Sequence, residues 1–236
     1  MKNEIIEKIK KELINNVDEH TLVIAQSFFK EKIKFYGVKS AIVGKISAEH
    51  FSCIKKETKE VIFSLCEELL KSDYSEEAYI AFDWVYRINK LYQEEDFVIF
   101  ERWVNNYVNS WAKCDTLCNH AIGSFIDKFP EYIEKLKIWT KSQNRWVRRA
   151  SAVTLIIPAR RGKYIKDIFE ISDLLLLDND DLVQKGYGWM LKEASKVNQK
   201  EVYEYVIRNK TSMPRTALRY AIEKMPEDLR KEAMIK

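Results

Sequence analysis

Apolar residues recur at helical spacing along almost the whole chain, and this period constrains the fold more than any other feature. In the first segment Ile5, Ile6, Ile9 and Leu13 repeat every few residues between charged side chains. Residues 57–70 repeat the pattern with Val61 among the apolar positions. Runs that alternate apolar and polar residues with period two are absent, so no strand is expected. The sequence therefore predicts an all-α fold.

The predicted helices are short and similar in length. About fourteen of them cover the chain, joined by connections of about two to six residues. Antiparallel pairs at a pitch of roughly 35 to 45 residues indicate an α-solenoid of HEAT-like or armadillo-like repeats. Such a solenoid has a concave face lined by the second helix of each pair. With no linker or low-complexity segment, we expect a single domain over residues 1–236.

Some helix boundaries can be predicted as well. Thr21 is a candidate N-cap for a helix over residues 21–36, and Gly37 is its expected stop. A weaker helix is predicted over residues 38–52, split by Gly44. Another is predicted to begin at Asp115 and to close before Pro130.

Composition excludes several classes of protein. Charged residues make up 32% and hydrophobic residues 46%, a balance typical of a folded globular chain. No apolar run is long enough to cross a membrane, and the N-terminus lacks a signal-peptide pattern, so we expect a cytoplasmic protein with no membrane partner. Its four cysteines are expected to be reduced. Cys114 and Cys118 with His120 lack a second ligand pair, so no metal site is predicted.

Trp111 and Asp115 form the most informative pair near the middle of the chain. On a helix, residues four apart lie on the same face, so an indole would sit beside a carboxylate. Two interpretations remain open for Asp115: it caps the start of a helix, or it stabilises positive charge in a cleft. Trp111 and Trp189 could equally be core residues.

Basic residues are concentrated in the second half. Arg145, Arg148 and Arg149 flank Trp146, and residues 143–166 contain no acid. The charges are therefore not absorbed within the helix, which favours a polyanionic partner over a merely solvated surface. The net charge of +4 permits this only if the basic residues share one surface.

A second cationic stripe surrounds Trp189. Lys185, Trp189, Lys192 and Lys196 recur at i, i+4, i+7 and i+11. An aromatic ring among cations is unsuited to a core and suits a phosphate backbone with a stacking platform. We expect this stripe, the basic segment around Trp146 and the Trp111–Asp115 pair to converge in space.

These segments together resemble the HEAT-like-repeat alkylpurine DNA glycosylases (the AlkD family). The likeness is carried by Ser110-Trp111-x3-Asp115, by Trp146-Val147-Arg148-Arg149-Ala150 and by Val183-Gln184-Lys185-x2-Gly188-Trp189. Phe35-Tyr36-Gly37-Val38 and Glu77-Ala78-Tyr79-Ile80-Ala81-Phe82-Asp83 extend it over almost the whole chain.

The resemblance implies roles for individual residues. Asp115 matches the catalytic aspartate, Trp111 and Trp189 match two active-site tryptophans, and Arg149 matches an arginine that contacts the DNA backbone. Phe28 stands where the family has a tyrosine, and Asp181 and Leu182 stand where phenylalanines are expected. Further DNA contacts are predicted from Lys113, Arg145, Arg148, Lys185, Lys192 and Phe28.

The favoured hypothesis is a monofunctional DNA glycosylase that hydrolyses the N-glycosidic bond of positively charged N3- or N7-alkylpurines in duplex DNA. It requires no metal and no organic cofactor, and the protein is expected to be a monomer that associates with the nucleoid when bound to DNA. The alternatives are a non-catalytic HEAT-repeat protein that recognises distorted or branched DNA, and a protein-interaction module whose groove binds an acidic peptide.

Overall fold

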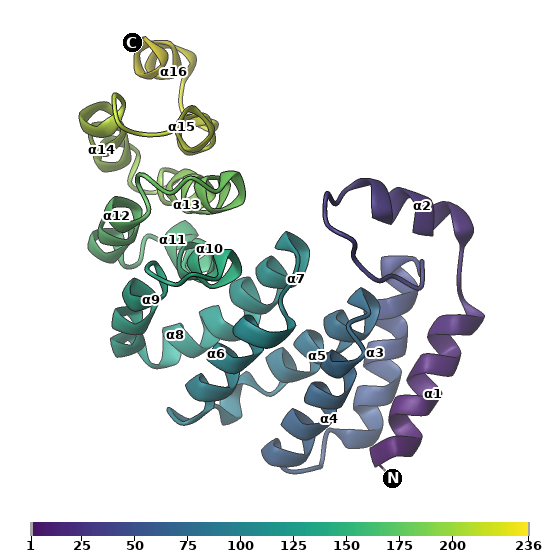
Figure 1. Cartoon of the computed structure of the whole chain (residues 1–236). Helices are drawn as coiled ribbons and strands as arrows, with labels where there is room; N and C mark the ends of the chain where they lie inside the picture. The colour runs from purple at the N-terminus through teal and green to yellow at the C-terminus, as the bar shows by residue number, and fades with distance from the viewer. Residues whose placement is uncertain (1, 236) are drawn as a thin grey trace. The chain divides into compact units, whose positions relative to one another are not determined.

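The computed structural model of the protein describes residues 2–235, and its regular structure is helical throughout (Figure 1). In this part of the chain, β character is confined to one isolated bridge between Lys34 and Tyr74. The predicted all-α, solenoid-type fold is confirmed. The described residues pack as two compact units, and a single domain over the whole chain stays a prediction.

The first unit contains the residues up to Asp96 together with Asn106–Thr116. Within it α3, α4 and α5 lie side by side, and α1 packs on α3 and α4 (Figure 1). Its elements are α1 (Lys2–Asn15), α2 (Glu19–Ser27), α3 (Ser40–Ile54), α4 (Lys59–Lys71), α5 (Ser75–Arg87), the 3-10 turn η1 (Asn89–Leu91) and α7 (Trp111–Thr116).

The second unit contains Phe97–Asn105 and the chain from Leu117 onward. Successive helices pack as neighbours, with α13 in contact with α10, α11, α12, α14 and α15. Its elements are most of α6 (Asp96–Tyr107), the π-helical segment η2 (Leu117–Ile122), α8 (Gly123–Lys128), η3 (Pro130–Tyr132), α9 (Ile133–Trp139), α10 (Arg145–Val153), α11 (Ile156–Arg160), α12 (Ile165–Leu174), α13 (Asp181–Ala194), α14 (Gln199–Asn209), α15 (Arg215–Ile222) and α16 (Glu227–Met234).

Each unit has its own apolar core. In the first, Trp84 is fully buried and its indole N–H donates to the Ser47 carbonyl at 3.0 Å, which satisfies the one polar atom of the ring. In the second, Phe97 stacks on Trp139 at 5.3 Å, and Phe169 stacks on Tyr205 at 4.8 Å. These contacts join α3 to α5, α6 to α9 and α12 to α14.

The predicted helix over residues 21–36 is wrong in both of its boundaries. Asp18, rather than Thr21, caps α2, because its carboxylate accepts the Thr21 amide at 2.7 Å. The helix ends at Ser27, and the chain then runs in irregular and extended form toward α3. Long-range pairing overrides the local helical pattern here, since the Lys34 carbonyl accepts the Ser75 amide at 3.0 Å.

Two other local expectations also fail. Gly44 does not split a helix, because α3 runs unbroken through it from Ser40 to Ile54. Asp115 does not start one, because α7 already begins at Trp111. The hydroxyl of buried Ser110 accepts the Lys113 amide at 3.2 Å and so serves as the cap.

Among the described residues, none of the helices combines the length and the apolar character that a membrane crossing requires.

Candidate active site and nucleic-acid interface

Helix α7 presents Trp111 and Asp115 one turn apart. Both residues are half-buried, and four residues of helix separate them by a rise of about 6 Å, which confirms that they share a face. Because Ser110 caps the helix, the Asp115 carboxylate is not needed for the cap. The interpretation of Asp115 as a helix cap is therefore wrong.

An aromatic pocket of about 290 Å³ opens beside Trp111 in the first unit. The indole of Trp111 stacks on the Phe29 ring at 5.2 Å with an interplanar angle of 17°, and Phe29 in turn contacts Phe35 at 5.5 Å. Phe28 also lines the pocket, although 66% of its surface is exposed. Of the residues predicted for the site, Trp111 and Phe28 are thus brought together.

Glu76 supplies a carboxylate to this pocket and also fixes its wall. Its two oxygens accept the backbone amides of Tyr36, Gly37 and Val38 at 3.1, 2.9 and 3.2 Å. Gly37 has a φ of 89°, and a side chain there would meet the Leu22 Cβ at 2.6 Å. The turn therefore requires glycine, both for its backbone conformation and for the close approach of α2.

Lys113 does not project toward solvent. Its side chain is 1% exposed, and its ammonium donates to the Asp73 carboxylate at 2.9 Å and to the Asp73 carbonyl at 3.0 Å. Burial lowers the pKa of Lys113, while its hydrogen bond and charge interaction with Asp73 oppose that shift. We therefore assign Lys113 a structural role, tying α7 to the α4–α5 turn, in place of the predicted phosphate contact.

The arginines of α10 lie in the second unit. Asn144 caps the helix by accepting the Trp146 amide at 2.9 Å. Arg145 pairs with Asp180 at 2.9 Å, and Arg148 pairs with Asp178 at 2.6 Å. Arg149 is only 5% exposed, and its guanidinium donates to the Leu182 carbonyl. All three side chains are therefore held against the loop before α13 and the start of that helix.

Two glycines of α13 lie within the sequence motif around Trp189. A Cβ at Gly186 would lie 3.4 Å from Cγ of Arg149, an ordinary van der Waals contact, so Gly186 packs against that arginine without being required by it. A side chain at Gly188 would lie 2.8 Å from the Ala217 carbonyl oxygen, so this glycine allows α15 to pack closely. Trp189 is half-buried, and its indole N–H donates to Glu193 of the same helix at 3.4 Å.

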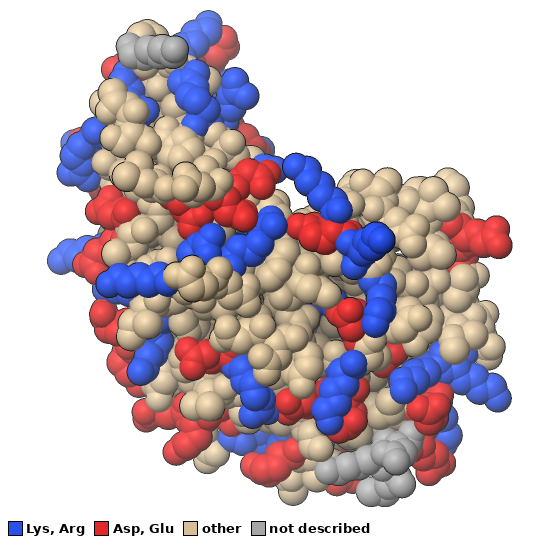
Figure 2. Space-filling view, viewed as in Figure 1, with Lys and Arg blue, Asp and Glu red and all other residues tan. Residues whose placement is uncertain are grey.

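The lysines around Trp189 also have acidic partners. Lys185 pairs with Asp181 at 3.2 Å, Lys192 with Glu223 at 2.9 Å and Lys196 with Glu193 at 2.7 Å. The absence of acids between residues 143 and 166 also gave a misleading picture of charge, because Asp180 and Asp178, which pair with Arg145 and Arg148, lie in the loop before α13. On the visible face, acidic and basic side chains lie interspersed over much of the surface (Figure 2).

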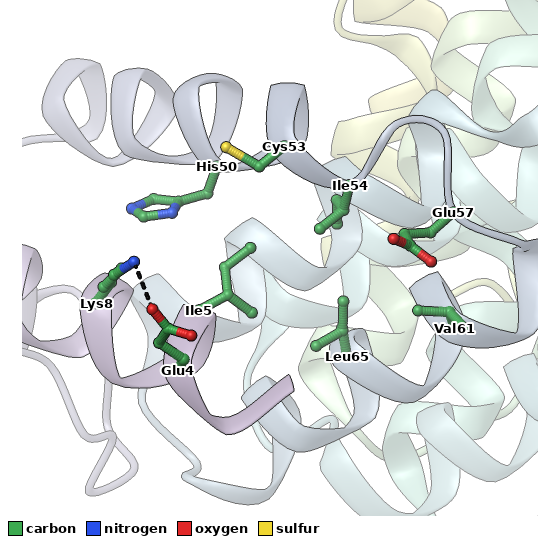
Figure 3. Close-up of a pocket in the computed structure, with 9 residues that line it drawn as sticks. All are labelled: Glu4, Ile5, Lys8, His50, Cys53, Ile54, Glu57, Val61 and Leu65. Carbon is green, nitrogen blue, oxygen red and sulfur yellow. Dashed lines mark hydrogen bonds and ion pairs between the residues drawn. The ribbon is translucent and has the colours of Figure 1, made fainter. Parts of the chain in front are cut away.

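A second pocket, of about 390 Å³, lies among α1, α3 and α4 (Figure 3). Ile5, Ile54 and Leu65 supply much of its apolar lining. Three of its polar side chains already have partners, since Lys8 binds Glu4 at 2.9 Å and the His50 ring lies 3.0 Å from a Glu12 oxygen. No residue predicted for the site lines it, so we do not assign the chemistry to this pocket.

The structure also bears on metal binding. Among the described residues, no group of three His, Cys, Asp or Glu side chains is arranged to hold a metal ion. Cys114 and Cys118 are fully buried, and neither forms a disulfide.

The predicted residues fall into two groups. Trp111, Asp115, Lys113 and Phe28 belong to the first unit, and the second unit holds Trp189 with the predicted basic residues, namely Arg145, Arg148, Arg149, Lys185 and Lys192. Convergence of the two groups on one substrate stays a prediction. Sequence reasoning missed the pocket residues Phe29 and Glu76, although Phe35 and Tyr79, which also line it, lie in segments that carried the resemblance.

The stacked helices of this chain place it in the class of α-solenoid proteins. Proteins of this class present extended surfaces for binding. Comparison with known proteins narrows this class. Residues 9–225 match the family described as DNA alkylation repair enzyme, so the chain belongs to that family. The predicted resemblance is confirmed at this level, and membership supports a role in alkylation repair.

A solved structure shares the fold. The chain is similar to a predicted DNA alkylation repair enzyme from Enterococcus faecalis, with a TM-score of 0.80 and 17% sequence identity. The match covers 90% of this chain and 98% of the other. No curated protein matches the sequence.

Proposed function

We propose that the protein is a monofunctional DNA glycosylase that hydrolyses the N-glycosidic bond of positively charged alkylpurines in duplex DNA. The observation that carries this proposal is the Trp111–Asp115 pair on α7, beside an aromatic pocket, in a chain of the DNA alkylation repair family. Family membership alone leaves the reaction open. Trp111 and Asp115 on α7 support cleavage of the N-glycosidic bond in particular.

The proposed hydrolysis requires few catalytic groups. An N3- or N7-alkylated purine already carries positive charge, so it departs without a general acid. As the bond breaks, the deoxyribose acquires oxocarbenium character, and a fixed carboxylate such as Asp115 stabilises it by opposite charge. The water that attacks the sugar completes the hydrolysis. No metal and no organic cofactor take part in the proposed reaction.

The indole of Trp111 also stabilises the positive charge that develops on the sugar. Its π face attracts a cationic sugar or base by about 0.5 to 2 kcal/mol. Trp189 would add a second face if the two units converge on the lesion, and a contact of Arg149 with the DNA backbone would require its guanidinium to leave the Leu182 carbonyl. Such phosphate contacts would make DNA binding weaken steeply with salt.

The decisive experiment measures release of methylated purines from alkylated duplex DNA by wild type and by Asp115→Asn. We expect the variant to bind DNA with similar affinity and to release base about 100-fold more slowly or worse, the usual loss when a preorganised electrostatic group is removed. Asp228→Asn is a matched control, because Asp228 is exposed on α16, beyond the matched residues.

Two results would contradict the proposal. Full activity of Asp115→Asn would show that the carboxylate has no role in base release. Binding of DNA by wild type without any base release above the spontaneous rate would instead support a non-catalytic DNA-binding protein. Asp181 and Leu182, at the start of α13 where the family resemblance predicts phenylalanines, are the observation that favours this second function.

A further inference from the structure

The pairing of basic side chains raises the question of which cations are available to a phosphate. In the second unit, Arg145, Arg148, Lys185 and Lys192 each lie within 3.2 Å of a carboxylate. A phosphate that binds one of them must compete with that carboxylate. Exposed cations that have no acidic partner offer a less costly contact.

Lys30 and Lys32 are two such cations in the first unit. Both side chains are exposed, and neither forms an ion pair or a hydrogen bond with any residue in the described range 2–235. Phe28, which is 66% exposed, lies two residues before Lys30, and Glu31 stands between the two lysines. The segment thus presents an aromatic ring and two unpaired ammonium groups within five residues.

The backbone keeps these ammonium groups on the surface. The chain leaves helical conformation after Ser27, bends at Lys30 and Glu31, and forms an isolated bridge at Lys34, where successive side chains point to opposite sides. Ile33 is 8% exposed and Phe35 lines the aromatic pocket, whereas Lys32, before Ile33, and Lys34, between the two, are exposed. This inward anchoring fixes the lysines beside the pocket that also contains Trp111.

The neighbouring surface is apolar. Helix α2 buries none of its residues, and Val23 and Ile24 are 66% and 42% exposed. The face of the molecule over α2 is largely without charged side chains (Figure 2). A partner that covers this surface must combine anionic groups with flat or apolar ones, as the backbone, sugars and bases of nucleic acid do.

We propose that Lys30 and Lys32 bind phosphates of duplex DNA and place Phe28 against the sugar-base edge next to the lesion. One residue separates Lys30 from Lys32, and phosphates of one strand advance by about 3.4 Å along the helix axis per nucleotide, so both ammonium groups are close enough to contact the same strand. This assignment rests on the proposed function, because it places the same lesion beside Trp111.

The test is the salt dependence of DNA binding by the full chain. The affinity for an alkylated duplex is measured at several salt concentrations for wild type and for Lys30→Gln/Lys32→Gln. Each phosphate contact contributes about 0.9 to the slope of log affinity against log salt, so the double variant should lose about 1.8 from the magnitude of the slope.

Lys55→Gln/Lys56→Gln is the matched control. These residues are also exposed and unpaired within the described part of the first unit, and the variant removes the same charge. They follow the C-terminal end of α3, whereas Ser40 and Val43 at its N-terminal end line the pocket. The length of α3, roughly 22 Å, separates the two sites. The control should keep the wild-type slope.

The outcomes separate this inference from the function on which it rests. Base release by wild type together with an unchanged slope in Lys30→Gln/Lys32→Gln overturns the inference and leaves the glycosylase intact. An equal fall in both double variants also overturns it, since net charge alone would then be responsible. Absence of both DNA binding and base release in wild type overturns the two proposals together.

Discussion

Glu76 and Glu77 are adjacent in sequence and both buried, yet their surroundings differ. Glu76 accepts three backbone amides from residues 36–38, so both of its oxygens have hydrogen-bond donors. Glu77 accepts the Tyr36 hydroxyl at 2.7 Å through one oxygen. Burial raises the pKa of Glu77 above its ordinary value of 4.5, while the hydrogen bond from Tyr36 opposes the shift.

This difference gives a prediction on stability against pH. A raised folded-state pKa means that the stabilising contribution of Glu77 is fully present below its unfolded pKa and is lost as the pH rises through the folded value. Glu77→Gln abolishes this titration, and its amide oxygen can still accept the Tyr36 hydroxyl. Relative to wild type, the variant should therefore gain stability as the pH rises from about 4.5 toward neutral. Urea unfolding across this range measures the effect.

Glu76→Gln is the control for that experiment. The amide replaces one accepting oxygen by a donor, so at least one backbone amide loses its partner. We expect a loss of about 1 to 3 kcal/mol in the free energy of unfolding at neutral pH. If Glu77→Gln and wild type instead give parallel profiles, Glu77 does not titrate with a raised pKa.

At the residue scale, the sequence predicted part of the candidate site. The spacing of Trp111 and Asp115 was sufficient to place them on one helical face. The burial of Lys113 could not be predicted, because it depends on Asp73, which lies forty residues earlier in a turn with a φ of 67°. The acid partners of Arg145 and Arg148 were missed for the same reason, since each comes from a distant segment.

At the scale of elements, helix periodicity predicted most helices but not the end of α2. The apolar pattern continues through Phe29, Ile33 and Phe35, which suits a helix as well as an extended chain buried on one side. The outcome is decided by tertiary contacts, because Glu76 binds the amides at 36–38 and the Lys34 carbonyl accepts from Ser75. A single-sequence pattern contains no information on these partners.

The packing of α13 on α15 gives a prediction at this scale. Gly188→Ala would place a methyl group 2.7 Å from the Tyr220 Cβ and 2.8 Å from the Ala217 carbonyl oxygen. The gain in helix propensity, about 1 kcal/mol, is smaller than the cost of separating two helices. We expect a net loss of about 1 to 3 kcal/mol in the free energy of unfolding.

Gly44→Ala in α3 is the matched substitution. A methyl group there meets nothing within 4 Å, so only the backbone term remains and the variant should gain about 0.5 to 1 kcal/mol. Urea denaturation of both proteins provides the comparison. Equal stability of the two variants would contradict the close contact between α13 and α15.

At the scale of the whole molecule, the reactivity of the cysteine thiols can be used to follow the unfolding of the two units. Cys53 is exposed, whereas Cys66, Cys114 and Cys118 are fully buried, and burial raises the pKa of the Cys66 thiol. A thiol reagent should therefore modify one cysteine rapidly in the native protein and all four in denaturant. Cys53→Ser should abolish the rapid phase.

The same thiols test whether the chain is one domain. Cys66 and Cys114 belong to the first unit and Cys118 to the second. A single cooperative domain exposes all three at the same urea concentration. Exposure of Cys118 at a different concentration from Cys66 would show two domains and would contradict the prediction of one domain over residues 1–236.

Helix α2 has a consequence for how such proteins diversify. None of its side chains is fully buried, so substitutions at its outward positions do not disturb a core, whereas Thr21, Ile24 and Ala25 line the aromatic pocket. The Asp18 cap and the glycine at position 37 constrain its attachment. Natural selection can therefore remodel this helix while the helices beneath it are inherited unchanged. Under the proposed function, proteins that descend from one ancestor would come to favour different DNA adducts through substitutions in α2.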